Sequence, residues 1–176
     1  IEELKKISVA FKPSNFTSLL NNKITQGELS AELELYLDDS NLLDNFIVRG
    51  SVSNLKVKIV NDIELEKTDF NFFADKSDIL LTNISSETAI LKIIDGDLKL
   101  RLSSDISLES NFKTNIKYDY KLKNYLDLIK DYKYLKNLVT LEASMNNNLI
   151  IIFDKTYKIK KYDYKNSGKI SKAILD

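Results

Sequence analysis

The stretch "LKLRLSSDISLESNFKTNIKYDYKL" at residues 98–122 has all of its large apolar residues at even-numbered positions. The odd-numbered positions are polar or charged, as at Lys99, Asp105 and Lys117. This period of two is that of a β-strand with one apolar and one wet face. One strand of this length would reach roughly 80 Å at ~3.3 Å per residue, well beyond ordinary strands. We therefore expect two or three strands in the same phase, with breaks at Ser103-Ser104 and Ser110-Asn111.

The same alternation runs through much of the chain. In "GELSAELELYL" (27–37) the apolar residues lie at odd positions. In "NFIVRGSVSNLKVKIV" (45–60) the phase changes near Ser53-Asn54, which predicts a β-bulge or a short turn, and it changes again between Leu65 and Phe70. Further strands are expected at 139–145 and 149–153, separated by a turn at Asn146-Asn147-Asn148.

Asp95-Gly96-Asp97 stands between the apolar runs "LKII" and "LKLRL". Asp-Gly between two such runs is a strong hairpin signal, because both residues tolerate positive φ. A calcium loop would need further oxygen ligands at fixed spacing, and the residues after Asp97 do not supply them. The sequence therefore predicts a turn here and no metal site.

One segment departs from the period of two. From Leu122 to Leu135 the apolar residues follow helical spacing, and Asn124 with Asp127 forms a plausible N-cap pair. We expect one amphipathic helix at about 124–136. A short helix within residues 12–22 is a further alternative.

Composition limits the classes of function. The chain has 176 residues, is 43% hydrophobic, and balances 26 basic against 26 acidic residues. It is thus long enough for one sizeable core and forms a single β-rich segment over residues 1–176, without the net charge that favours nucleic acid. Most basic residues are Lys rather than Arg, which also argues against a nucleic-acid partner. The chain starts at Ile1 in patterned sequence, so we expect it to belong to a longer protein.

The sequence contains none of the common catalytic motifs. His and Cys are absent, which removes the commonest general base and the commonest soft metal ligands. Glycine-rich phosphate loops and nucleophile elbows are also missing. The pair Asp38-Asp39 lies in "LDDSNLLDN", a composition typical of a loop. We expect no enzyme activity, no catalytic residues, no bound metal and no cofactor.

The chain also contains a weak internal repeat. The stretches "GSVSNLKVKIVNDIELEKTDFNF" (50–72) and "GDLKLRLSSDISLESNFKTNI" (96–116) both run from Gly through alternating residues to Asp-Ile-x-Leu-Glu and then Phe. Repeated strand units indicate an extended antiparallel sheet. Its apolar face needs a cover, which a second sheet would supply in a β-sandwich and a ligand would supply in an open, curved groove. Both architectures alternate identically, so the sequence leaves both open.

Four stretches carry a resemblance to a known family: "GELSAELEL", "NFIVRGSVSNLKVKI", "IELEKTDFNFFAD" and "IIDGDLKLRLSSDISLESNFKTNI". Their successive strands and Gly-led steps resemble the AsmA-like superfamily of Gram-negative bacteria, with its YhdP and TamB types, over most of residues 27–118. The closing "YKNSGKISKAIL" fits more loosely. The resemblance implies a mainly β, taco-like sheet around a hydrophobic groove, in a periplasmic protein anchored to the inner membrane through a segment not present here.

The resemblance further implies that the segment conducts phospholipid between the inner and outer membranes along this groove, as bridge-like lipid transfer proteins do. The expected partners are phospholipid acyl chains, with the membrane reached through other parts of the protein and envelope proteins as further partners. The alternative is a structural or protein-binding β-sandwich domain of a cell-envelope or surface protein. The expected groove lining consists of Leu29, Leu33, Leu35, Leu98, Leu100, Leu102, Ile106, Leu108, Phe112 and Ile116.

Overall fold

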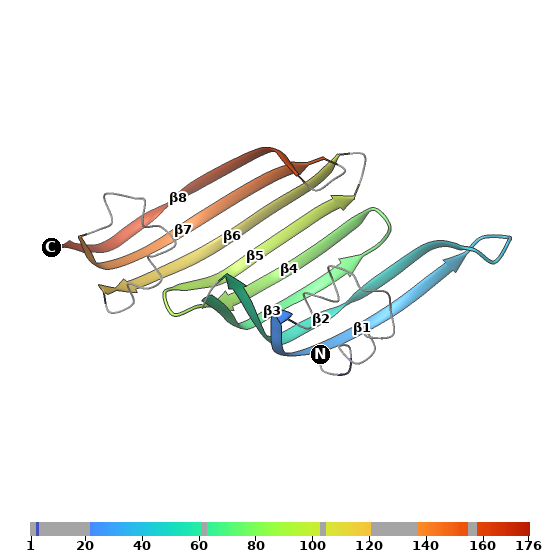
Figure 1. The fold of residues 1–176 in the computed structure, drawn as a ribbon, viewed down its shortest axis with the longest axis horizontal. Coiled ribbons are helices and arrows are strands. Elements are labelled where there is room, and N and C mark those ends of the chain that lie inside the picture. The colour runs from blue at the N-terminus through green and yellow to red at the C-terminus, as the bar shows by residue number, and fades with distance from the viewer. Residues whose placement is uncertain (1–2, 4–21, 61–62, 103–104, 121–136, 155–157) are drawn as a thin grey trace.

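A computed structural model describes residue 3 and residues 22–60, 63–102, 105–120, 137–154 and 158–176. The described chain forms one eight-stranded antiparallel sheet in which every strand lies beside its neighbours in sequence (Figure 1). The mainly β architecture expected from the alternation is therefore confirmed. The strands are β1 (Ile24–Leu37), β2 (Leu43–Val60), β3 (Ile63–Ala74), β4 (Asp78–Glu87), β5 (Leu91–Leu102), β6 (Ile106–Asp119), β7 (Leu138–Phe153) and β8 (Ile159–Leu175).

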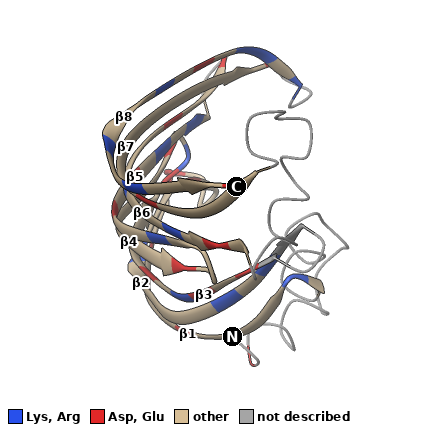
Figure 2. Cartoon of the chain, turned by 90° about the vertical axis from the view of Figure 1, so that its left-hand side faces the viewer, with Lys and Arg blue, Asp and Glu red and all other residues tan. Residues whose placement is uncertain are grey.

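The sheet is open and bent. All eight strands belong to the same sheet, so the described residues contain no second sheet of a sandwich. The view along its edge shows the strands arranged in an arc (Figure 2). The expected helix at 124–136 and most of the alternative at 12–22 lie outside the described residues.

The loop between β1 and β2 is built by its own polar side chains. The Asp38 carboxylate accepts hydrogen bonds from the backbone N–H groups of Ser40 (2.8 Å) and Leu42 (2.9 Å). Asn41 adopts a φ of 59°, a conformation that Asn tolerates better than most residues. The loop expected at Asp38-Asp39 is thus confirmed.

Two changes of phase in the sequence are β-bulges in the structure. The pairing of β2 with β3 shifts between Val52 and Leu55, where Asn54 has a φ of 50° and its N–H donates to the Asp69 carboxylate (2.9 Å). A further shift between β3 and β4 lies beside Lys67, which has a φ of 47°. Each bulge returns the apolar residues to one face after the phase has slipped.

The turn expected at Asp95-Gly96 is wrong, because both residues lie inside β5. The pairing of β5 with β6 shifts between Ile93 and Asp95, after which Gly96 lies opposite Phe112. The apolar residues change from odd to even positions at this point, and a bulge within one strand absorbs that change. Gly96 has no positive φ, and it lies where side chains of the neighbouring strands come close, as described below.

Two other expected breaks are also wrong. Ser110-Asn111 lies within β6, and Asn146-Asn147-Asn148 lies within β7. These polar residues find partners on neighbouring strands: Asn148 donates to Asn111 (2.7 Å), and the Ser110 hydroxyl donates to the Asp97 carbonyl (3.0 Å). The break at Ser103-Ser104 is confirmed, because β5 ends just before it and β6 begins just after it.

Candidate functional site

The pairing register places a complete row of apolar residues across the sheet. Directly opposed residues of antiparallel strands project to the same face. Following the pairs from β1 to β8 gives a row made of Leu33, Val48, Ala74, Ile79, Leu100, Leu108, Ile151 and Tyr162. We call the side of the sheet that carries this row the apolar face, and the opposite side the charged face.

All of the lining residues expected from the sequence lie on the apolar face. Leu29 and Leu35 flank Leu33 along β1 and share its side of the strand. On β5 and β6 the expected residues oppose one another, as in Leu102 with Ile106. Further residues of the apolar face come from β2, β3, β4, β7 and β8, which were not among the expected lining although their alternation carries the same signal.

Side chains converge on the apolar face. A Cβ atom added to Gly96 would stand 3.3 Å from the Cβ atoms of Ile84 on β4 and Phe112 on β6. Opposed Cβ atoms are ordinarily ~4.5–5.5 Å apart in antiparallel sheets. Such crowding is expected on the inner side of a bend, and we therefore place the apolar face on the inside of the arc in Figure 2.

The apolar face is sheltered at its centre and open at both ends. Val52, Ile106 and Tyr118 are buried, with Tyr118 only 3% exposed. At the two edges of the sheet, Leu33 is 60% exposed and Tyr162 is 71% exposed. Exposed apolar side chains at the edges of a sheet are candidate contact surfaces for a ligand or another chain.

A hydrogen-bonded polar cluster interrupts the apolar face over β6, β7 and β8. Its centre is Asn147, which is 6% exposed and donates to the Phe112 carbonyl (3.1 Å) and the Thr114 hydroxyl (3.2 Å). Its side-chain carbonyl accepts from the Tyr164 hydroxyl and from Asn166, both at 2.7 Å. Polar residues on this face were not anticipated, because their satisfaction depends on cross-strand pairing that no local pattern shows.

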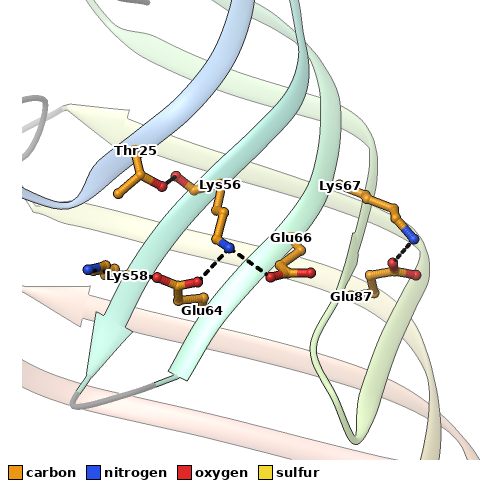
Figure 3. A network of polar contacts seen from close by, with 7 residues as sticks. All are labelled: Thr25, Lys56, Lys58, Glu64, Glu66, Lys67 and Glu87. Atoms are coloured by element: carbon orange, nitrogen blue, oxygen red, sulfur yellow. Dashed lines mark hydrogen bonds and ion pairs between the residues drawn. The ribbon is translucent and has the colours of Figure 1, made fainter.

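Ion pairs join neighbouring strands on the charged face (Figure 3). Lys56 of β2 bridges two carboxylates of β3, with its Nζ atom 2.8 Å from Glu64 and 2.9 Å from Glu66. Lys67 pairs in the same way with Glu87 of β4. These are solvent-exposed contacts, and each one contributes little to stability on its own.

The ion pairs shift the protonation equilibria of their members. Hydrogen bonds with Glu64 and then Glu66 raise the pKa of Lys56, and the Lys56 hydrogen bond lowers the pKa of Glu64. The pKa of Glu87 is lowered in the same way by its hydrogen bond with Lys67. Burial, with a smaller effect of the Asp119 charge, raises the pKa of Tyr118.

The lowered pKa of Glu64 predicts a pH dependence of stability. Its contribution is complete above the unfolded pKa of about 4.3 and disappears as the pH falls through the lower pKa of the folded state. Thermal unfolding of the wild type should therefore show a falling midpoint in this acid range, and Lys56→Gln should flatten that fall. Lys117→Gln, which removes the same charge from the exposed side of β6, is the control. Equal acid profiles for the two variants would contradict the prediction.

The acidic residues singled out in the sequence take part in local contacts. Asp95 forms an ion pair with Lys113 (3.0 Å), and Asp38 caps its own loop. Within the described parts of the chain, no group of three or more His, Cys, Asp or Glu side chains is placed to hold a metal ion.

The charged face also carries an open depression of about 470 Å³ over β5 to β8, lined mostly by polar residues. Its side chains are amides, carboxylates and ammonium groups that hydrogen-bond one another in part, as Asn148 does with Asn111 and Lys113 does with Asp95. The lining residues on this face are Asp95, Asp97, Asn111, Lys113, Asn146, Asn148, Lys165 and Ser167.

Among the residues that the structure describes, none forms a helix that is both long and apolar enough to cross a membrane. Comparisons with models of protein families, with curated proteins and with solved structures find no match to this chain.

Proposed function

We propose that the apolar face binds phospholipid acyl chains and that the chain is a lipid-conducting segment of the AsmA-like type. The observation that carries the proposal is the apolar row that crosses all eight strands and stays exposed at both edges. A row confined to the centre of the sheet would serve a dry core equally well. Apolar side chains that continue to both edges instead provide an apolar row across the whole arc, beside the polar cluster around Asn147.

The chemistry of this surface suits acyl chains. Each methylene that leaves water against the leucines, valines and isoleucines of the apolar face contributes ~0.8 kcal/mol. Such contacts are non-directional, so a chain can shift from one strand to the next without breaking a specific bond. Headgroups would remain in water at the open side of the arc, and the work of the segment would be binding and guidance rather than catalysis.

In this proposal the segment operates in the periplasm, anchored to the inner membrane through a part of the protein outside this chain. The lipid would pass between the inner and outer membranes with its acyl chains on the apolar face. The ion pairs of the charged face, such as Lys56 with Glu64, would keep the opposite side of the sheet in contact with water.

Native mass spectrometry of the purified chain, with lipid extraction of the same sample, tests the proposal. We expect the wild type to carry phospholipid. The double variant Leu100→Glu/Leu108→Glu places two carboxylates in the apolar row and should lower bound lipid by at least about tenfold, since losing ~1.4 kcal/mol is sufficient for that change.

The matched control makes the same kind of change on the opposite side of the sheet. Leu80→Glu/Ile150→Glu alters the charged face, where Leu80 lies opposite Lys99, and it should retain the lipid. Far-UV circular dichroism must show folded sheet in both variants. A folded wild type without lipid would overturn the proposal, and equal losses in the two variants would show that the apolar face is not the site.

A further inference from the structure

The two edge strands of the sheet, β1 and β8, have features that would allow them to pair with each other. Among the described residues, β1 and β8 each have a strand neighbour on one side alone, and they lie at opposite edges of the sheet (Figure 1). Edge strands expose backbone donors and acceptors that can pair with another chain. Both strands are long, at 14 and 17 residues, and the chain's single Pro lies in neither of them.

The charges of the two edges are complementary on the charged face. The side chains that β1 presents there include Glu28, Glu32 and Glu34. Those of β8 are mainly basic, with Lys161, Lys165, Lys169 and Lys172 beside a single acid, Asp163. One edge is therefore acidic and the other basic on the same side of the sheet.

The apolar faces of the two edges also match. Leu35 of β1 is 59% exposed and Ile170 of β8 is 58% exposed, both on the apolar face. In a meander of eight antiparallel strands, β8 runs opposite to β1. A second copy in the same orientation would thus place its β1 antiparallel to β8 of the first, with the apolar faces on one side.

We propose that β8 of one copy pairs with β1 of a second copy, which extends the sheet and its apolar face from chain to chain. The occupant is a second copy because each edge carries the charge that the opposite edge of the same chain requires. Such head-to-tail contacts are heterologous, so they form a series or a closed ring rather than an isologous dimer. Pairing between β8 and β1 does not require bound lipid, so delipidated protein is the sample to use.

Charge exchange between the edges is the decisive experiment. Lys161→Glu/Lys165→Glu/Lys169→Glu makes both edges acidic, and Glu28→Lys/Glu32→Lys/Glu34→Lys makes both basic. Each variant alone should self-associate at least about tenfold more weakly than the wild type, because like charges then meet at the junction. An equimolar mixture should restore association, since every β8–β1 junction again joins opposite charges. Sedimentation velocity at low salt, with one variant fluorescently labelled, measures both results.

Two further variants separate an effect at the strand edges from a general effect of net charge or of lost ion pairs. Lys58→Glu/Lys92→Glu/Lys117→Glu makes the same change in net charge on inner strands of the charged face and should associate like the wild type. Tyr162→Lys adds a charge to the exposed apolar side of β8, and it should prevent association. Unlike the variant with three Glu→Lys changes, it leaves the ion pairs of Arg49 with Glu32 and Glu34 in place. A wild type that stays monomeric at low salt, or a mixture that fails to recover association, would overturn the proposal.

Discussion

Gly50→Ala is expected to destabilise the sheet by about 3 kcal/mol, the scale of severe overpacking in a well-packed region. Gly50 lies inside β2, opposite Ala31 of β1 and Phe72 of β3. An added Cβ atom would overlap the backbone carbonyl oxygen of Ser30 and would come within 2.9 Å of both the Ala31 Cα and the Phe72 ring. The backbone of β1 would have to move, and its pairing with β2 would weaken.

Gly96→Ala is the matched control for this prediction. The nearest atoms to the new Cβ atom would be the Cβ atoms of Ile84 and Phe112, at 3.3 Å, and the Ile84 carbonyl oxygen, at 3.4 Å. Small shifts relieve such contacts, and alanine restricts the unfolded chain, so we expect a change below about 1 kcal/mol. Urea unfolding of the two variants measures the difference in free energy. Equal stabilities would show that β1 and β2 are not as close at Gly50 as the structure has them.

These two glycines also show how far the sequence predicts the fold. Each begins one copy of the internal repeat, and each copy is a hairpin in the structure, from β2 to β3 and from β5 to β6. The strands, their faces and the bulge at Ser53-Asn54 follow from alternation, because a strand buried on one face must keep its apolar residues in phase. Neither glycine marks a turn, since both allow close approach between strands.

The wrong predictions share a physical cause. Asp95-Gly96 and Asn146-Asn147-Asn148 are composed of turn-forming residues, and local composition does not distinguish a turn from a strand that pairs on both sides. Asp95 is stabilised in β5 by Lys113, which is 18 positions later in the chain. Only the register of the whole sheet brings these partners together, and the sequence does not state that register.

The candidate site, like the fold, could be predicted from the sequence only in part. Alternation was sufficient to place Leu29, Leu100 and Phe112 each on the apolar side of its own strand, because that assignment needs only the period of two. The polar cluster around Asn147 could not be predicted, since its donors and acceptors come from three different strands. The exposure of Leu33 and Tyr162 likewise depends on β1 and β8 being the edges of the sheet.

Asn147→Leu is expected to cost about 2–3 kcal/mol, because it leaves buried polar groups without their partner. The variant keeps the approximate volume of the side chain but removes the donor to the Phe112 carbonyl and the acceptor for the Tyr164 hydroxyl. Thr114, which is 3% exposed, also loses a hydrogen bond. Since Asn147 links β6 to β8, hydrogen exchange of the β8 amides should accelerate along with the fall in unfolding free energy.

Two comparisons separate the loss of these bonds from a general effect of leucine. Asn148→Leu alters the next residue, whose bond to Asn111 lies on the exposed charged face, and it should cost less than about 1 kcal/mol. Asn147→Leu combined with Thr114→Val removes both ends of a buried hydrogen bond and should recover part of the lost stability. If Asn147→Leu is instead as stable as the wild type, the cluster does not stabilise the fold. Its place in the middle of the apolar face would then need a functional explanation, such as contact with the polar part of a bound lipid.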